Sequence, residues 1–166
     1  MVVLLARQWG VDVGRCLLAG LLHDLGKPYA KSAQREKLDG CTAVPPTRDD
    51  FECAPVWHGL ISAQEGRAVY GVEDREVLEA VAYHSTGAPN LGDVGLVLYV
   101  SDFAEPSRNW AGVEQIRAHL RSLTLKEAAA EVARLKQERL DKKGQPAHPR
   151  THAMYEWLQS SLKKGG

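Results

Sequence analysis

The sequence predicts an all-α protein that forms one helical domain of six to seven helices. Apolar residues recur at helical spacing in several segments, each bounded by capping or breaking residues. No two segments show the alternation of apolar and polar residues that is typical of paired strands. With 166 residues, the chain is long enough for one well-packed core and short for two, so residues 1–166 are predicted to be a single domain.

The first two predicted helices lie near the N-terminus. The opening segment MVVLLARQWG is apolar up to Arg7 and predicts a short helix. Helical spacing of apolar residues continues through 12–25, with Asp12 as the expected N-cap. Gly26 and Pro28 are expected to end this second helix.

Residues 30–56 have a different character. They mix charged residues with Pro45, Pro46 and Pro55 and show no sustained period. We expect a long surface loop that holds at most one short helix. Within a small domain, a loop of this length is typical of a lid or a binding loop.

Two more helices are predicted at 58–70 and 74–84, with Gly71 as the break between them and Asp74 as a cap. The apolar run at 93–104 is compatible with a strand or a helix, and its length together with Asp93 as the expected cap favours a helix.

The last two predicted helices have clear boundaries. Thr124 and Glu127 have the spacing of a capping box at the start of a helix over 124–143. Pro146 and Pro149 are expected to break the chain before a final helix at about 151–163.

Charge and cysteine content exclude several functions. Lys and Arg (21) balance Asp and Glu (21), which argues against a duplex nucleic acid or a polybasic membrane contact. The three cysteines are odd in number and form no CxxC pair, so neither a disulfide framework nor a thiolate zinc site is expected. With no signal peptide or membrane span recognisable, we expect a cytoplasmic protein. The oligomeric state stays open, with a homodimer as one option.

Ionisable residues stand at the predicted helix ends. His23 and Asp24 close one helix, His58 opens another and His84 closes a third, while Asp102 lies among apolar neighbours. Each has a simpler explanation alone: a chance HD dipeptide, a core histidine, or a carboxylate that caps a helix or joins a buried ion pair. Together they offer the imidazole and carboxylate ligands that zinc, iron and manganese accept.

Several motifs resemble one family. The segment LLAGLLHDLGK at 17–27 is similar to the signature of the HD-domain metal-dependent phosphohydrolases. Five further segments occur in the order found in its bacterial YqeK-type members: WHG at 57–59, YHSTG at 83–87, SDFAEPSR at 101–108, GVEQIR at 112–117 and HPRTHAMYEWL at 148–158. Those proteins are symmetrical diadenosine tetraphosphate hydrolases, and the resemblance covers nearly the whole chain.

The resemblance implies roles for individual residues. His23, Asp24 and Asp102 would be metal ligands, with Asp24 bridging two ions, and His58 and His84 would complete the shell of the second ion. Lys27 would approach a phosphate, while Thr86, Gly87 and Arg108 would surround the nucleotide together with His84. Without the resemblance, Lys27 is equally well interpreted as a solvated loop lysine, and Arg108 as a surface partner of Glu105.

The implied activity is hydrolysis of diadenosine tetraphosphate to two ADP by a metal-activated water. The resemblance favours iron, as one or two ions, although manganese and zinc accept the same ligands. The expected partner is a dinucleoside polyphosphate or a nucleotide resembling ADP or GDP. No serine or cysteine stands in a nucleophile elbow and no P-loop is present, so no covalent nucleophile is expected.

One feature of the family pattern falls upstream of Met1. Aligning the family's Leu-Ala pair with Leu5 and Ala6 puts a further ligand histidine roughly seven residues before Met1, and the apolar first turn resembles the middle of a helix. We expect either an in-frame upstream histidine on a longer first helix or a site that binds metal less tightly.

Three other functions remain open on the sequence alone. One is a different HD-type activity, on nucleoside triphosphates or cyclic phosphodiesters, against which YHSTG and the EPSR segment argue. Another is a nucleotide-binding module with impaired catalysis because a ligand histidine is missing. The last is a helical scaffold without a metal site.

Overall fold

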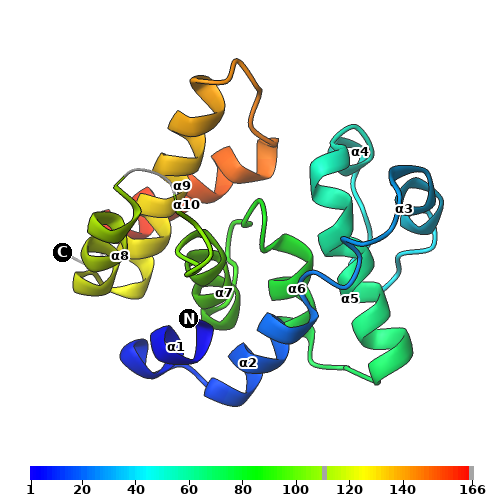
Figure 1. The fold of residues 1–166 in the computed structure, drawn as a ribbon, viewed down its shortest axis with the longest axis horizontal. Helices are drawn as coiled ribbons and strands as arrows, with labels where there is room; N and C mark the ends of the chain where they lie inside the picture. Colours follow the sequence, from blue (N-terminus) through cyan, green and yellow to red (C-terminus); the bar gives the residue numbers. More distant parts are fainter. Residues whose placement is uncertain (110–111, 165–166) are drawn as a thin grey trace.

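The computed structural model describes residues 1–109 and 112–164, and every regular element in these ranges is a helix (Figure 1). The all-α prediction is confirmed, but the described part holds ten α-helices and a 3-10 helix rather than six or seven helices. In chain order they are α1 (Val2–Trp9), α2 (Val13–Leu22), α3 (Lys31–Leu38), α4 (Arg48–Phe51), the 3-10 helix (Ala54–Val56), α5 (Trp57–Tyr70), α6 (Arg75–Tyr83), α7 (Asp93–Phe103), α8 (Val113–Ser122), α9 (Leu125–Asp141) and α10 (Pro149–Lys164).

Helix α7 is the centre of the fold. It packs against α1, α2, α6 and α9, and nine of its eleven residues are buried. A helix that is apolar on every side is stable in water only when other helices surround it. This explains why the run at 93–104 shows no clear period, and the prediction of a helix there is confirmed.

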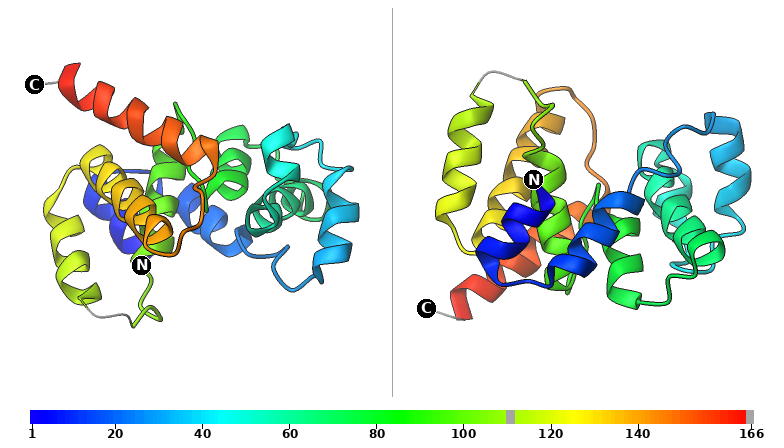
Figure 2. Two further views of the ribbon diagram at one scale, coloured as in Figure 1. Left: turned by 90° about the horizontal axis from the view of Figure 1, so that it is seen from above. Right: turned by 60° about the horizontal axis from the view of Figure 1, so that its bottom comes forward.

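The remaining helices extend the core on both sides of α7. On one side α5 packs against α6 and carries α3 on its outer face, while on the other α8 and α10 pack against α9 (Figures 1 and 2). The turns after α2 and α6 and the C-terminal end of α7 carry the polar residues described below.

Three predicted helix caps are confirmed. The side chain of Asp12 accepts a hydrogen bond from the Arg15 N–H at 2.9 Å, and Asp74 caps the start of α6 in the same way. Thr124 and Glu127 form the predicted capping box at the start of α9. These side chains accept from N–H groups that have no partner inside the helix.

Other predicted boundaries were wrong. The helix expected over 12–25 ends at Leu22, and the chain turns at 23–28. Asp93 is the first residue of α7 rather than its cap, because Glu76 of α6 accepts the hydrogen bond from the Val94 N–H at 3.1 Å. Pro149 is the first residue of α10 and not part of the break before it. Proline is well suited to this position because the first turn of a helix does not need its missing N–H.

The long loop expected at 30–56 contains α3, α4 and the 3-10 helix. Hydrogen bonds of a buried polar side chain hold this segment in place, and a search for periodic apolar residues does not detect them. Gln34, buried in α3, donates from Nε2 to the Gly26 carbonyl at 2.9 Å and to the Tyr29 carbonyl at 3.1 Å. Helix α8 was likewise not predicted, although Val113 and Leu120 bury one face of it.

No helix in the described ranges is both long enough and apolar enough to cross a lipid bilayer.

A buried ion pair fastens α4 to the start of α10. The fully buried carboxylate of Asp50 accepts two hydrogen bonds from the Arg150 guanidinium, at 2.8 and 2.7 Å, and two more from Thr47. The guanidinium also lies 4.5 Å from the centroid of the Tyr83 ring. Burial alone would raise the pKa of Asp50, but the hydrogen bonds from Arg150 and Thr47 outweigh it and hold this pKa below its usual value.

Replacing Asp50 by Ala leaves Arg150 without its carboxylate partner in a buried setting. We expect D50A to lower the free energy of unfolding by about 3–5 kcal/mol, the cost known for breaking a buried pair. Urea unfolding at neutral pH measures this value. The matched control is E52A, which removes an exposed partner of Arg48 and should change the same quantity by about 1 kcal/mol or less. Equal small losses in both variants would show that the Asp50–Arg150 pair does not fasten α10.

Candidate metal centre

The centre begins at the tight turn that follows α2. The chain places His23 and Asp24 directly after Leu22 and then brings Gly26 against α5. A Cβ at Gly26 would lie 2.6 Å from the His58 carbonyl oxygen, so only glycine permits this approach. The Gly26 N–H donates to the Ser62 hydroxyl at 2.9 Å, which fixes the turn on α5.

Three of the predicted ligands lie together. His23, Asp24 and His84 each offer one ligand atom, and these atoms lie within 4.8 Å of one another. His23 Nε2 is 3.6 Å from Asp24 Oδ2, and His84 Nε2 is 3.8 Å from Asp24 Oδ1. Side chains from two turns that are distant in the sequence therefore form a group that could hold a divalent metal ion.

His58 joins this group from the second position of α5. Its Nε2 lies 3.6 Å from Asp24 Oδ1 and 3.1 Å from His84 Nε2. The two carboxylate oxygens of Asp24 thus face different histidines: Oδ2 faces His23, and Oδ1 faces His58 and His84.

Backbone carbonyls orient two of the imidazole rings. His23 Nδ1 lies 2.7 Å from the Gly20 carbonyl oxygen, and His84 Nδ1 lies 2.8 Å from that of Val81. A carbonyl can only accept, so each Nδ1 carries a proton, and in the neutral form of such a ring it is the unprotonated Nε2 that is turned toward Asp24. This is the tautomer that a metal-binding histidine needs.

Burial keeps the imidazole rings of His58 and His84 uncharged. It lowers the pKa of His58, and it lowers the pKa of His84 to about 3. Both side chains are therefore neutral near pH 7, with a free electron pair available to a metal ion.

Asp24 is ionised for a different reason. Burial alone would raise its pKa, but the hydrogen bond from Lys27 and the positive charge of Lys27 outweigh burial, so the pKa lies below its usual value. Lys27 Nζ lies 2.9 Å from Asp24 Oδ2, and the lysine side chain is otherwise exposed. The structure therefore brings Lys27 to the centre as a partner of its carboxylate.

Asp102 lies beside the centre at the C-terminal end of α7. It lines a cavity of about 260 Å³ together with His23, and its own side chain is mostly buried. Arg108 lies 3.4 Å from Asp102 through Nη2 and 3.9 Å from Glu105 through Nε. Arg108 therefore contacts Asp102 as well as Glu105, the surface partner that the sequence also allowed.

Thr86 and Gly87 are buried in the turn after His84. The Thr86 hydroxyl donates to the Gly87 carbonyl at 2.9 Å. Gly87 has a φ of 69°, and a Cβ at this position would lie 1.7 Å from the sulfur of Met154. These contacts shape the turn that carries His84, and neither residue lines the cavity that Asp102 shares with His23.

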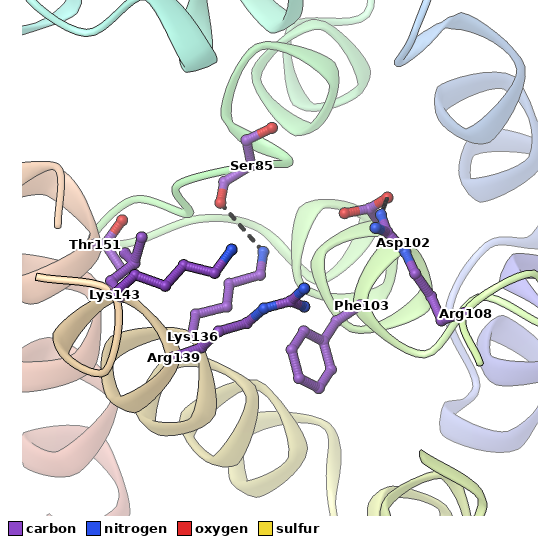
Figure 3. Close-up of a pocket in the computed structure, with 9 residues that line it drawn as sticks. Ser85, Asp102, Phe103, Arg108, Lys136, Arg139, Lys143 and Thr151 are labelled. Carbon is purple, nitrogen blue, oxygen red and sulfur yellow. Dashed lines mark hydrogen bonds and ion pairs between the residues drawn. The ribbon is translucent and has the colours of Figure 1, made fainter. Parts of the chain in front are cut away.

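The structure adds residues that the sequence analysis did not consider. A second cavity, of about 240 Å³, lies on the other side of Asp102 and is lined by Ser85, Phe103, Arg108, Lys136, Arg139, Leu140, Lys143 and Thr151 (Figure 3). Lys136, Arg139 and Lys143 follow one another at helical spacing at the end of α9. The spacing of these residues can be read from the sequence, but the net charge of zero, which is a sum over the whole chain, does not reveal a local cationic cluster.

Comparison with known proteins identifies the family. The sequence profile of the HD domain matches residues 1–157. The symmetrical bis(5'-nucleosyl)-tetraphosphatase of Bacillus subtilis is 31% identical over 94% of this chain and 82% of its own length. The protein of the same name from Halalkalibacterium halodurans is 30% identical over 93% of this chain and 81% of its own length.

The fold agrees with this. A crystal structure from Clostridium acetobutylicum, described as a predicted HD superfamily hydrolase involved in NAD metabolism, superposes with a TM-score of 0.86 at 26% identity. The match covers 96% of this chain and 84% of the other. A family profile that spans most of the chain, relatives of similar length and a shared fold all agree: the chain belongs to the HD domain family.

Proposed function

We propose that this protein hydrolyses diadenosine tetraphosphate symmetrically, giving two ADP. One structural observation carries the proposal: imidazole nitrogens and an ionised carboxylate converge within 4.8 Å in the HD turn and the turn after α6. Relatives named for this reaction match more than nine-tenths of the chain, which supports the same substrate here.

The proposed ligands are His23, Asp24, His58, His84 and Asp102. Asp24 directs its two oxygens at different histidines, the orientation that a carboxylate bridging two ions requires. No thiolate contributes, and histidine with carboxylate suits iron, manganese or zinc. The resemblance to the HD phosphohydrolases favours iron.

At such a centre, a bound ion makes water a stronger acid and offsets the negative charge of phosphate. The protein's own part is to position the phosphate chain. Lys27 and Arg108 lie beside Asp24 and Asp102, so both can exchange a carboxylate contact for a phosphate oxygen when substrate binds. Thr86 and Gly87, in the turn that follows His84, are proposed to contact the nucleotide.

The direct test combines elemental analysis with product analysis. Protein purified without chelator should contain a transition metal and release two ADP for each diadenosine tetraphosphate consumed. ATP and AMP as products would replace the proposal with a different phosphohydrolase activity. Tight nucleotide binding without any product would favour a binding module instead.

The variant D24A should lose turnover and retain less metal. The carboxylate of Asp24 faces His23, His58 and His84, so its loss removes a ligand and a negative charge from the centre. Metal stoichiometry and circular dichroism measure both effects, and the helical content should stay unchanged. The matched control is D39A, which removes an exposed carboxylate at the C-terminal end of α3. Full activity and metal content in D24A would exclude Asp24 as a ligand.

Replacing Lys27 or Arg108 by Ala should slow hydrolysis without releasing metal. We expect each change to reduce kcat/KM by an amount that corresponds to about 2–4 kcal/mol, the range for a lost electrostatic donor. R48A, at a fully exposed position on α4, is the control. If K27A and R108A keep the parental kinetics, both residues serve only as surface charges.

In metal-free protein, the His84 ring should stay neutral, with its proton on Nδ1, from pH 8 down to about pH 5 because burial lowers its pKa. Nitrogen-15 NMR of the imidazoles distinguishes the two nitrogens and reports their protonation. A ring that gains a proton near pH 6.5 would show that His84 is solvated rather than held in the buried turn.

A further inference from the structure

The second cavity is strongly cationic in a chain of zero net charge. Four positively charged side chains line it, from Arg108, Lys136, Arg139 and Lys143, against the single carboxylate of Asp102. The excess of three positive charges marks this cavity as a place for an anion that carries several negative charges.

Three of these cations have no carboxylate partner in the described ranges. Lys136 Nζ donates to the Ser85 carbonyl at 3.1 Å and lies 3.7 Å from the centroid of the Tyr99 ring. The side chains of Arg139 and Lys143 make no hydrogen bond or ion pair among the residues that the structure places. Elsewhere on α9, two glutamates hold Arg134, so the cations at the cavity differ from it in having no carboxylate partner.

The three α9 cations form a row. Lys136, Arg139 and Lys143 are separated by three and four positions, so they lie on one side of the helix and its C-terminal turn. Figure 3 shows their side chains converging on the space between Ser85 and Asp102. Seven positions correspond to about 10 Å of helical rise, a length that suits a chain of linked phosphates better than a single one.

The row continues the metal centre. The Ser85 hydroxyl lies 3.0 Å from His84 Nε2, while the Ser85 carbonyl accepts from Lys136. Asp102 lines both this cavity and the one that contains His23. A phosphate chain with one end at His84 and Asp102 would therefore pass directly onto Lys136 and then toward Arg139 and Lys143.

A simpler role for these cations is to offset the helix dipole, since basic residues are common in last turns. Lys142 meets that need equally well at the C-cap of α9, and it does not line the cavity. The dipole therefore does not explain why the other cations gather on one face around Asp102.

We propose that Lys136, Arg139 and Lys143 form a binding row for the distal phosphates of a polyphosphate chain, which makes the protein selective for long dinucleoside polyphosphates. The inference rests on the proposed function, because it assigns the row to the part of the substrate beyond the cleaved bond. Charge-assisted contacts along the row would be made only by substrates long enough to reach it.

The test uses the double variant R139Q/K143Q, with K142Q as the matched control. For diadenosine tetraphosphate we expect KM to rise about tenfold or more in the double variant, in keeping with the loss of charged hydrogen bonds. For the shorter diadenosine triphosphate, kcat/KM should change much less, so the preference for the longer chain falls. K142Q should keep the parental values for both substrates.

Calorimetry with inorganic tripolyphosphate separates the outcomes. The parent should bind it and the double variant should bind it more weakly, whether or not hydrolysis is observed. Parental turnover with unchanged KM and selectivity in the double variant overturns the row and leaves the proposed function intact. No turnover by the parent, with a loss of tripolyphosphate binding in the variant, overturns the proposed function and leaves the row as a polyphosphate site. If the variant loses tripolyphosphate binding but keeps the parental KM and selectivity, the row does not contact the substrate, and the inference is overturned while the proposed function stands.

Discussion

The burial of α7 is the constraint on which the rest of the structure depends. Nine of its eleven residues are buried, so helices have to cover it on all sides, and α1, α2, α6 and α9 do so. Each fully buried Leu or Val side chain contributes about 2 kcal/mol relative to exposure. Because α2 and α6 pack against this helix, their C-terminal ends bring His23, Asp24 and His84 close to one another.

Polar interactions then adjust what packing has assembled. Carbonyl groups of Gly20 and Val81 set the orientation of two imidazole rings, and burial keeps the His84 ring uncharged. Asp102 is a polar residue in the last turn of the otherwise apolar α7, and it lines both cavities. The carbonyl contacts fix the orientation of the imidazole rings, which limits the reorganisation that the reaction would require.

The sequence predicted those parts of the fold that depend on local patterns. Caps at Asp12 and Asp74 and the capping box at Thr124 need only a few neighbouring residues, and all three are confirmed. Helix α3 could not be predicted, because buried Gln34 stabilises it through carbonyls outside the helix. The role of Asp93 as a cap was wrong for the same reason, since the acceptor for the Val94 N–H comes from Glu76 on another helix.

The candidate site shows the same division. The HD dipeptide and the resemblance pointed to the histidines and Asp24, and the structure brings His23, Asp24 and His84 together. The cationic row on α9 depends on the approach of α9 to the turn at Ser85, a tertiary contact that residue spacing alone does not reveal. Likewise, the close approach of Met154 to Gly87 joins residues that are far apart in the sequence, so only the folded structure shows it.

Anomalous diffraction from crystals of the protein purified without chelator tests the central claim most directly. Data collected across the absorption edge of the metal found by elemental analysis should show a peak at about 2.0–2.2 Å from ligand atoms of His23, Asp24 and His84. Such a peak would establish the imidazole and carboxylate group as the metal centre on which the proposed reaction depends. Metal bound only elsewhere on the protein, with these side chains free of it, would contradict the account.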